Sequence, residues 1–79
     1  MSKEDLLKKL EAIFQDTLEN PAIRLNFHTT ANDIAEWDSV THLVLLHAIE
    51  QELHVHFTID EVMHFQNVGD ICTCIASNH

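Results

Sequence analysis

The sequence predicts an all-α domain, a four-helix bundle with a long first loop and a short third helix. Three observations predict it. Apolar residues recur at helical spacing in two long segments. Gly and Pro occur once each, at Gly69 and Pro21, although antiparallel sheets need turns rich in both. Hydrophobic residues make up 46% of the 79 residues, which suits a single folded domain over residues 1–79.

The first helix is expected over residues 2–18. Ser2 and Asp5 resemble a capping box at its start, and Asn20-Pro21 ends it. Its apolar face consists of Leu6, Leu7, Leu10, Ile13, Phe14 and Leu18. Residues 19–37 then show no sustained period, and a loop of this length usually has a function. Apolar residues spaced along that loop are expected to pin it to the core: Ile23, Leu25, Phe27, Ile34 and Trp37.

The second helix is expected over residues 39–53, with Asp38 as its N-cap. Glu50 and Glu52 are expected to be exposed on its far side. Its apolar stripe consists of Leu43, Leu45, Leu46, Ile49 and Leu53.

Two shorter helices are expected to follow. Thr58 and Glu61 form a capping box for a short helix that runs through about Phe65. Asn67 caps a final helix, in which Gly69 is a weak point. The apolar residues of that helix are Val68, Ile71, Cys72 and Ile75.

Charge and hydropathy exclude several classes of function. The formal net charge is −9 and only four residues are basic, so nucleic acid is not an expected partner. No apolar stretch approaches the roughly 20 residues of a membrane span. The N-terminus does not resemble a secretory signal, and we expect a cytoplasmic monomer.

The His and Cys residues suggest a zinc site only weakly. The possible ligands are His54-x-His56, His64 and Cys72-x-Cys74, but this spacing matches no common zinc site. On a helix, the two Cys side chains point roughly 160° apart, which makes a disulfide between them strained. We therefore expect surface histidines, reduced thiols and no metal.

Ser39 is the first residue of the expected second helix. A helix N-terminus has unpaired N–H groups and a partial positive charge, so it tolerates a phosphate well. By chemistry alone, Asp38 and Ser39 are more simply explained as good helix-starting residues. A serine hydrolase is a poorer interpretation, because His42 lies one turn from Ser39 without a glycine elbow or an oxyanion loop.

A family resemblance gives Ser39 a more specific role. It is carried by residues 33–43, whose sequence is Asp-Ile-Ala-Glu-Trp-Asp-Ser-Val-Thr-His-Leu. This segment resembles the signature of acyl and peptidyl carrier proteins, whose motif is Asp-Ser-Leu at the start of the second helix. The similarity extends over essentially the whole chain. Its Trp-Asp-Ser form is more similar to free-standing, specialised carriers than to the general fatty-acid carrier.

The resemblance implies a carrier that is not itself an enzyme. Ser39 is then the covalent attachment site of a 4′-phosphopantetheine arm from coenzyme A, and Asp38 helps the transferase to place its metal and the serine. The implied partners are a phosphopantetheinyl transferase, an acyl- or aminoacyl-activating ligase, and an acyltransferase or synthase. The cargo is an acyl or aminoacyl group held as a thioester, in lipid or secondary-metabolite biosynthesis.

Two surfaces follow from the same resemblance. Val40 stands where the family usually has Leu. The partner-docking residues are expected to be Val40, Thr41, Val44, His47, Glu50 and Met63. Because only Glu50 among them is charged at neutral pH, we expect partners that bind by apolar contact more than by charge. A groove for the arm or its cargo is expected at Phe57, Val62 and Phe65.

A second interpretation belongs to another class of protein. The chain is then a non-enzymatic helical interaction module, whose acidic surface docks a partner and whose Ser39 is only a helix cap. Modification of Ser39 distinguishes the two interpretations.

Overall fold

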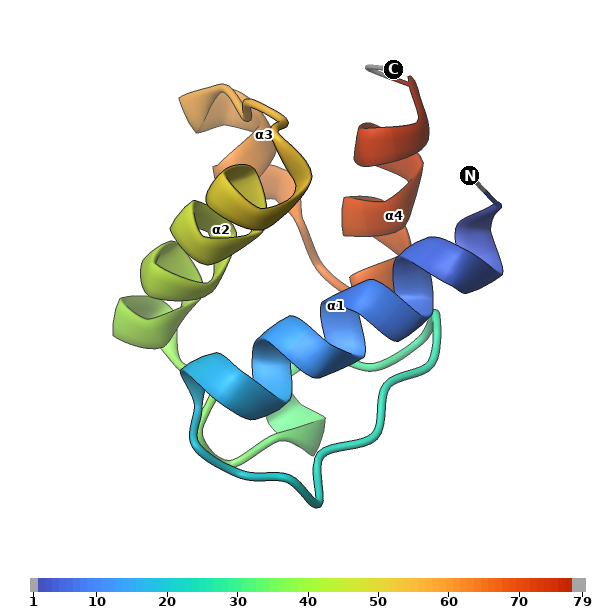
Figure 1. Cartoon of the computed structure of the whole chain (residues 1–79). Coiled ribbons are helices and arrows are strands. Elements are labelled where there is room, and N and C mark those ends of the chain that lie inside the picture. Colours follow the sequence, from blue (N-terminus) through green and yellow to red (C-terminus); the bar gives the residue numbers. More distant parts are fainter. Residues whose placement is uncertain (1, 78–79) are drawn as a thin grey trace.

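The computed structural model describes residues 2–77 and consists of helices joined by loops. The helices are α1 (Lys3–Thr17), α2 (Ser39–Leu53), α3 (Ile59–His64) and α4 (Val68–Ser77), with a 3-10 turn η1 (Ala31–Asp33) in the long loop. α1 packs against both α2 and α4, and α3 follows α2 and lies beside it (Figure 1). No strand occurs within residues 2–77, and the predicted all-α bundle is confirmed.

Side-chain caps set where the helices begin. Ser2 accepts the Asp5 N–H at the start of α1, and Thr58 and Glu61 form a reciprocal capping box at the start of α3. Asn67 Oδ1 accepts the Asp70 N–H at 2.8 Å at the start of α4. The sequence therefore located the helix starts well, because a cap depends on residues within one turn.

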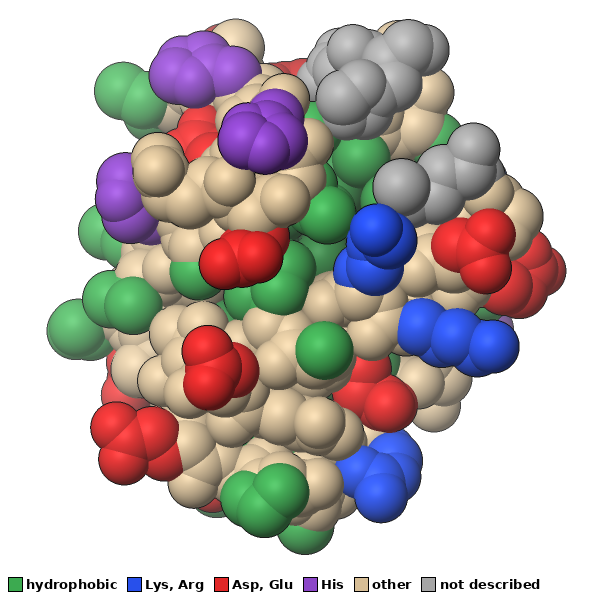
Figure 2. All heavy atoms as spheres, in the orientation of Figure 1, with side chains coloured by type: hydrophobic (Ala, Val, Ile, Leu, Met, Phe, Trp, Pro, Cys, Tyr) green, Lys and Arg blue, Asp and Glu red, His purple; other side chains and the backbone are tan. Residues whose placement is uncertain are grey.

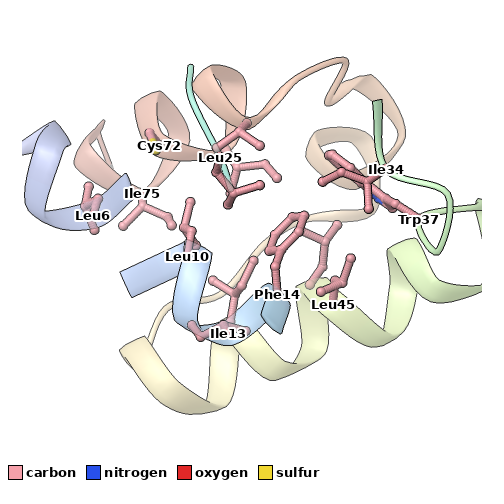
Figure 3. Close-up of a cluster of buried hydrophobic side chains, with 14 of the residues drawn as sticks. Leu6, Leu10, Ile13, Phe14, Leu25, Ile34, Trp37, Leu45, Cys72 and Ile75 are labelled. Carbon is pink, nitrogen blue, oxygen red and sulfur yellow. The ribbon is translucent and has the colours of Figure 1, made fainter. Parts of the chain in front are cut away.

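The core lies where α1, α2, α4 and the long loop meet. Figure 3 shows Phe14 of α1 close to Leu45 of α2 and to the loop residues Ile34 and Trp37. The rings of Phe14 and Trp37 meet edge to face, with centroids 5.0 Å apart. The largest fully buried side chains are Phe14, Leu10, Leu45, Ile49, Ile71, Ile75, Val68 and Cys72.

Leu43 is not part of this core, and its assignment to the buried stripe was wrong. Its side chain is exposed, whereas Leu45, Leu46 and Ile49 are buried. Leu43 and Leu45 point roughly 160° apart around the helix axis, so both cannot face α1. Leu43 is therefore available on the outer surface of α2.

The long loop is fixed to the N-terminus of α4 through its backbone. The Val68 N–H donates to the Thr29 carbonyl at 2.9 Å, and the Gly69 N–H donates to the Phe27 carbonyl at 2.8 Å. A Cβ on Gly69 would lie 2.7 Å from the Phe27 carbonyl oxygen, closer than real Cβ atoms approach. Gly69 is thus required for the loop to approach α4. The sequence pattern indicates only a weak point of the helix at Gly69 and does not predict this packing role.

Candidate functional site

The site is the N-terminus of α2, where the long loop ends. Asp38 caps the helix: its Oδ1 accepts the N–H groups of Val40 and Thr41, both at 2.9 Å. These two hydrogen bonds, the one from Thr41 first, lower the pKa of the Asp38 carboxyl. Ser39 is the first helical residue and is exposed. The cap therefore presents the Ser39 hydroxyl at the positive end of a 15-residue helix.

Thr41 completes the cap instead of facing outward. Its Oγ1 accepts the Asp38 N–H at 2.8 Å and donates to the Glu36 carbonyl at 2.8 Å. The side chain is half-buried by these contacts. The expectation that Thr41 lies on the outward face of α2 is wrong, because this hydroxyl closes the capping box.

A pocket of about 350 Å³ lies beside Ser39. It lies between the start of α2 and the end of α3, and Asp38 and His42 are the ionisable groups in its lining. The residues that line it are Ala31, Trp37, Asp38, Ser39, His42, Leu43, Val62, Met63, Phe65 and Gln66.

The predicted groove residues divide into two groups around this pocket. Val62 and Phe65 line it, as does Met63. Phe57 is buried and packs edge to face against Phe65, with ring centroids 5.4 Å apart, on the core side. Phe57 is thus absent from the lining of this pocket, and its role in a groove for the arm or its cargo stays a prediction.

His42 connects the two walls of the pocket. Its Nδ1 accepts the Trp37 indole Nε1–H at 3.1 Å, and its Nε2 lies 3.1 Å from the Val62 carbonyl oxygen of α3. The His42 and Trp37 rings are stacked, with centroids 5.9 Å apart. The spacing of Ser39 and His42 placed both on one side of α2, but nothing in the sequence indicated the contact with Val62, which lies 20 positions away.

An apolar surface borders the site on α2 and α3. The large hydrophobic side chains that are mostly exposed are Val40 (71%), Leu43 (60%), Val44 (52%), Ile59 (81%) and Met63 (75%). Figure 2 shows hydrophobic and His side chains along the α2 and α3 side of the molecule, whereas the Lys and Arg side chains lie toward α1. We call these five residues the apolar patch.

Glu50 lies behind this surface. Its Oε2 accepts the Phe57 N–H at 2.9 Å and lies 3.5 Å from His56 Nδ1, and its side chain is only 21% exposed. The expectation that Glu50 is exposed on α2 is wrong, because the chain after α2 folds back onto its carboxylate. His47 is exposed as expected, 4.0 Å from Glu50.

Cys72 and Cys74 form no disulfide in the part of the chain that the structure describes. Burial raises the pKa of Cys72 to about 11, and Cys74 Sγ lies 3.1 Å from Glu61 Oε2. Within residues 2–77, no cluster of three His, Cys, Asp or Glu side chains is arranged to hold a metal ion. Among the helices of the same range, none is long and apolar enough to cross a membrane.

Known proteins share both the sequence pattern and the fold. The family model for the phosphopantetheine attachment site matches residues 8–75. Among solved structures, the chain is similar to a holo acyl carrier protein from Geobacter metallireducens, determined by NMR in solution. The two are 32% identical with a TM-score of 0.84, and the alignment covers 91% of this chain and 83% of the other. No curated protein sequence gives a significant match.

Proposed function

Because this chain belongs to the phosphopantetheine-attachment family, we propose that Ser39 is the residue that bears its arm. The chain is an acyl carrier protein, not an enzyme. When bound, the arm supplies a terminal thiol that holds an acyl group as a thioester. The single observation that supports Ser39 is its exposed hydroxyl at the capped start of α2, beside the pocket.

The residues around Ser39 fit this group. The N-terminus of α2 stabilises a phosphodiester through its partial positive charge, and the attached phosphate stays in solvent. The pocket next to Ser39 has Leu43, Val62 and Met63 in its lining, which suits an apolar cargo or the apolar part of the arm. Asp38 fixes the helix start, and we propose that its carboxylate also helps the transferase to place its metal.

Loading of the arm is a direct test. The chain contains three serines, Ser2, Ser39 and Ser77, so Ser77→Ala is a matched control. The purified protein and its variants are incubated with coenzyme A, magnesium and a broad-specificity phosphopantetheinyl transferase, and intact masses are recorded. We expect one phosphopantetheine on the wild type and on Ser77→Ala, and none on Ser39→Ala. If the wild type gains nothing with several transferases, or Ser39→Ala still gains mass, the assignment is wrong.

We also propose that partner enzymes dock on the apolar patch in the cytoplasm. The partners are the transferase, an acyl- or aminoacyl-activating ligase, and an acyltransferase or synthase. Val40 and Val44 of the predicted docking set belong to the patch, as does Met63, and Leu43 and Ile59 extend it. Thr41 and Glu50 bind other parts of the chain and contribute less.

The composition of the patch predicts a weak salt dependence of docking. Its five side chains are uncharged, so screening removes little attraction. We expect the affinity for the transferase to change less than about threefold between low and moderate salt. Val44→Glu is expected to weaken binding, whereas Glu52→Gln, also on α2, is its matched control. A steep loss of binding with salt contradicts docking by apolar contact.

A further inference from the structure

The short helix α3 is held in place by little apolar burial. It has six residues, none of them buried, and two of its large apolar side chains, Ile59 and Met63, point into solvent. Isolated helices of this length are unstable in water. Val62 packs partly buried against the core, so the position of α3 depends on this one apolar contact and on specific hydrogen bonds with neighbouring helices.

One such contact is the hydrogen bond from α2. The last four carbonyls of a helix have no partner within the helix, and that of Val62 belongs to this group in α3. The Gln66 N–H, which would continue the helical pattern, donates to Asp70 Oδ2 at 2.9 Å instead. His42 Nε2 therefore supplies the donor for the Val62 carbonyl, at 3.1 Å.

The two partners of His42 determine its protonation. An indole N–H can only donate, so His42 Nδ1 is the acceptor for Trp37 and carries no proton. A carbonyl oxygen can only accept, so His42 Nε2 carries the proton that Val62 receives. The imidazole is thus the neutral Nε2–H tautomer, and both of its nitrogens are used.

We propose that His42 is a positioning residue: the hydrogen-bonded chain Trp37–His42–Val62, here called the His42 relay, fixes α3 relative to Ser39 and sets the size of the pocket between them. Trp37 links the relay to the core through its edge-to-face contact with Phe14. The relay itself requires no modification of Ser39, whereas its effect on cargo rests on the proposed function.

The Trp37 indole N–H provides a readout specific to the relay, because it donates directly to His42 Nδ1 at 3.1 Å. Trp37 is the only tryptophan, so its indole N–H gives one identifiable NMR signal.

The first test uses the unmodified protein. His42→Ala removes both bonds, His42→Gln retains a donor and an acceptor without a titrating group, and His28→Ala removes an exposed loop histidine as a control. We expect amides of α3, such as that of Val62, to exchange about tenfold faster in His42→Ala than in the control, with substantial rescue in His42→Gln. The Trp37 indole N–H signal should move in His42→Ala, which removes its acceptor, and stay near its wild-type position in His28→Ala.

Two outcomes overturn the relay. One is equal amide exchange of α3 in His42→Ala and His28→Ala. The other is a Trp37 indole N–H signal that stays at its wild-type position in His42→Ala. Neither outcome depends on Ser39, so failure of the relay is distinguishable from failure of arm attachment.

The second test measures the effect of the relay on cargo. The transferase loads Ser39 from butyryl- or dodecanoyl-coenzyme A and releases adenosine 3′,5′-bisphosphate. The melting temperatures of the two acylated products are then compared. If α3 is a fixed wall of the pocket, the pocket discriminates between short and long acyl chains. We therefore expect the difference in melting temperature between the two products to shrink by at least half in His42→Ala and to persist in His42→Gln. An unchanged difference in His42→Ala shows that the relay does not set the size of the pocket.

Discussion

The core and the functional site of this molecule are held together by different forces. In the core, α1, α2 and α4 bury Leu10, Phe14, Ile49 and Ile71 completely. At the site, α3 has no fully buried residue; it is held by the partly buried Val62 and by side-chain hydrogen bonds, including the one from His42 to Val62. Apolar burial spreads the stability of the core over many side chains, whereas the position of α3 depends on a few directional contacts that a single substitution can remove.

The largest expected effect on stability comes from shortening a buried side chain of the core, and a substitution on α3 is the comparison. Phe14→Ala removes a fully buried ring that contacts Trp37, and we expect it to lower the free energy of unfolding by about 3–5 kcal/mol. Met63→Ala on α3 should change it by less than about 0.5 kcal/mol, since that side chain is mostly exposed. Urea unfolding of both variants measures the contrast. Losses of similar size would mean that α3 is integrated into the core.

A smaller effect is expected at the contact between the long loop and α4. Gly69→Ala should destabilise the protein by about 1–3 kcal/mol, because the new Cβ forces the Phe27 carbonyl to move. Intrinsic helix propensity predicts the opposite sign, by about 1 kcal/mol in favour of Ala.

Thr73→Ala is the matched control for this substitution. It also places Ala in α4, but at an exposed position. It should be neutral or slightly stabilising. A stabilised Gly69→Ala would show that the loop yields at no cost and that only helix propensity acts at this position.

The contrast between the core and the site also explains which predictions from the sequence succeeded and which failed. Helix type, the start of each helix and most of the core follow from patterns within one or two turns, such as Asp38 before Ser39. Two features were missed because a partner lies beyond the same helix: Glu50 binds the Phe57 N–H, and His42 meets Val62 across 20 positions. Gly69 belongs to the same group, since its neighbour is the Phe27 carbonyl. The failure at Thr41 is different, because its partners Asp38 and Glu36 are close in sequence and the local capping box was overlooked.

The smallest expected effect is electrostatic, and it concerns the cap beside Ser39. The Thr41 and Val40 N–H groups hold the pKa of Asp38 below its ordinary value of 3.8. A carboxyl with a depressed pKa in the folded state stabilises the fold above its unfolded pKa, and this contribution is lost as the pH falls through the folded value. Stability that the cap provides at neutral pH should therefore decline only below about pH 3.8.

Asp38→Asn isolates this contribution, because asparagine also caps a helix but does not titrate. Urea midpoints of the wild type and the variant are measured from neutral pH to strong acid, and their difference removes the shared titration of the other carboxyl groups. We expect the wild type to lose stability relative to Asp38→Asn below about pH 3.8. A difference that stays constant contradicts a depressed pKa. Because the cap lies at the site and the core contains no titrating carboxylate, acid should loosen the start of α2 while Leu10, Phe14 and Ile71 remain packed.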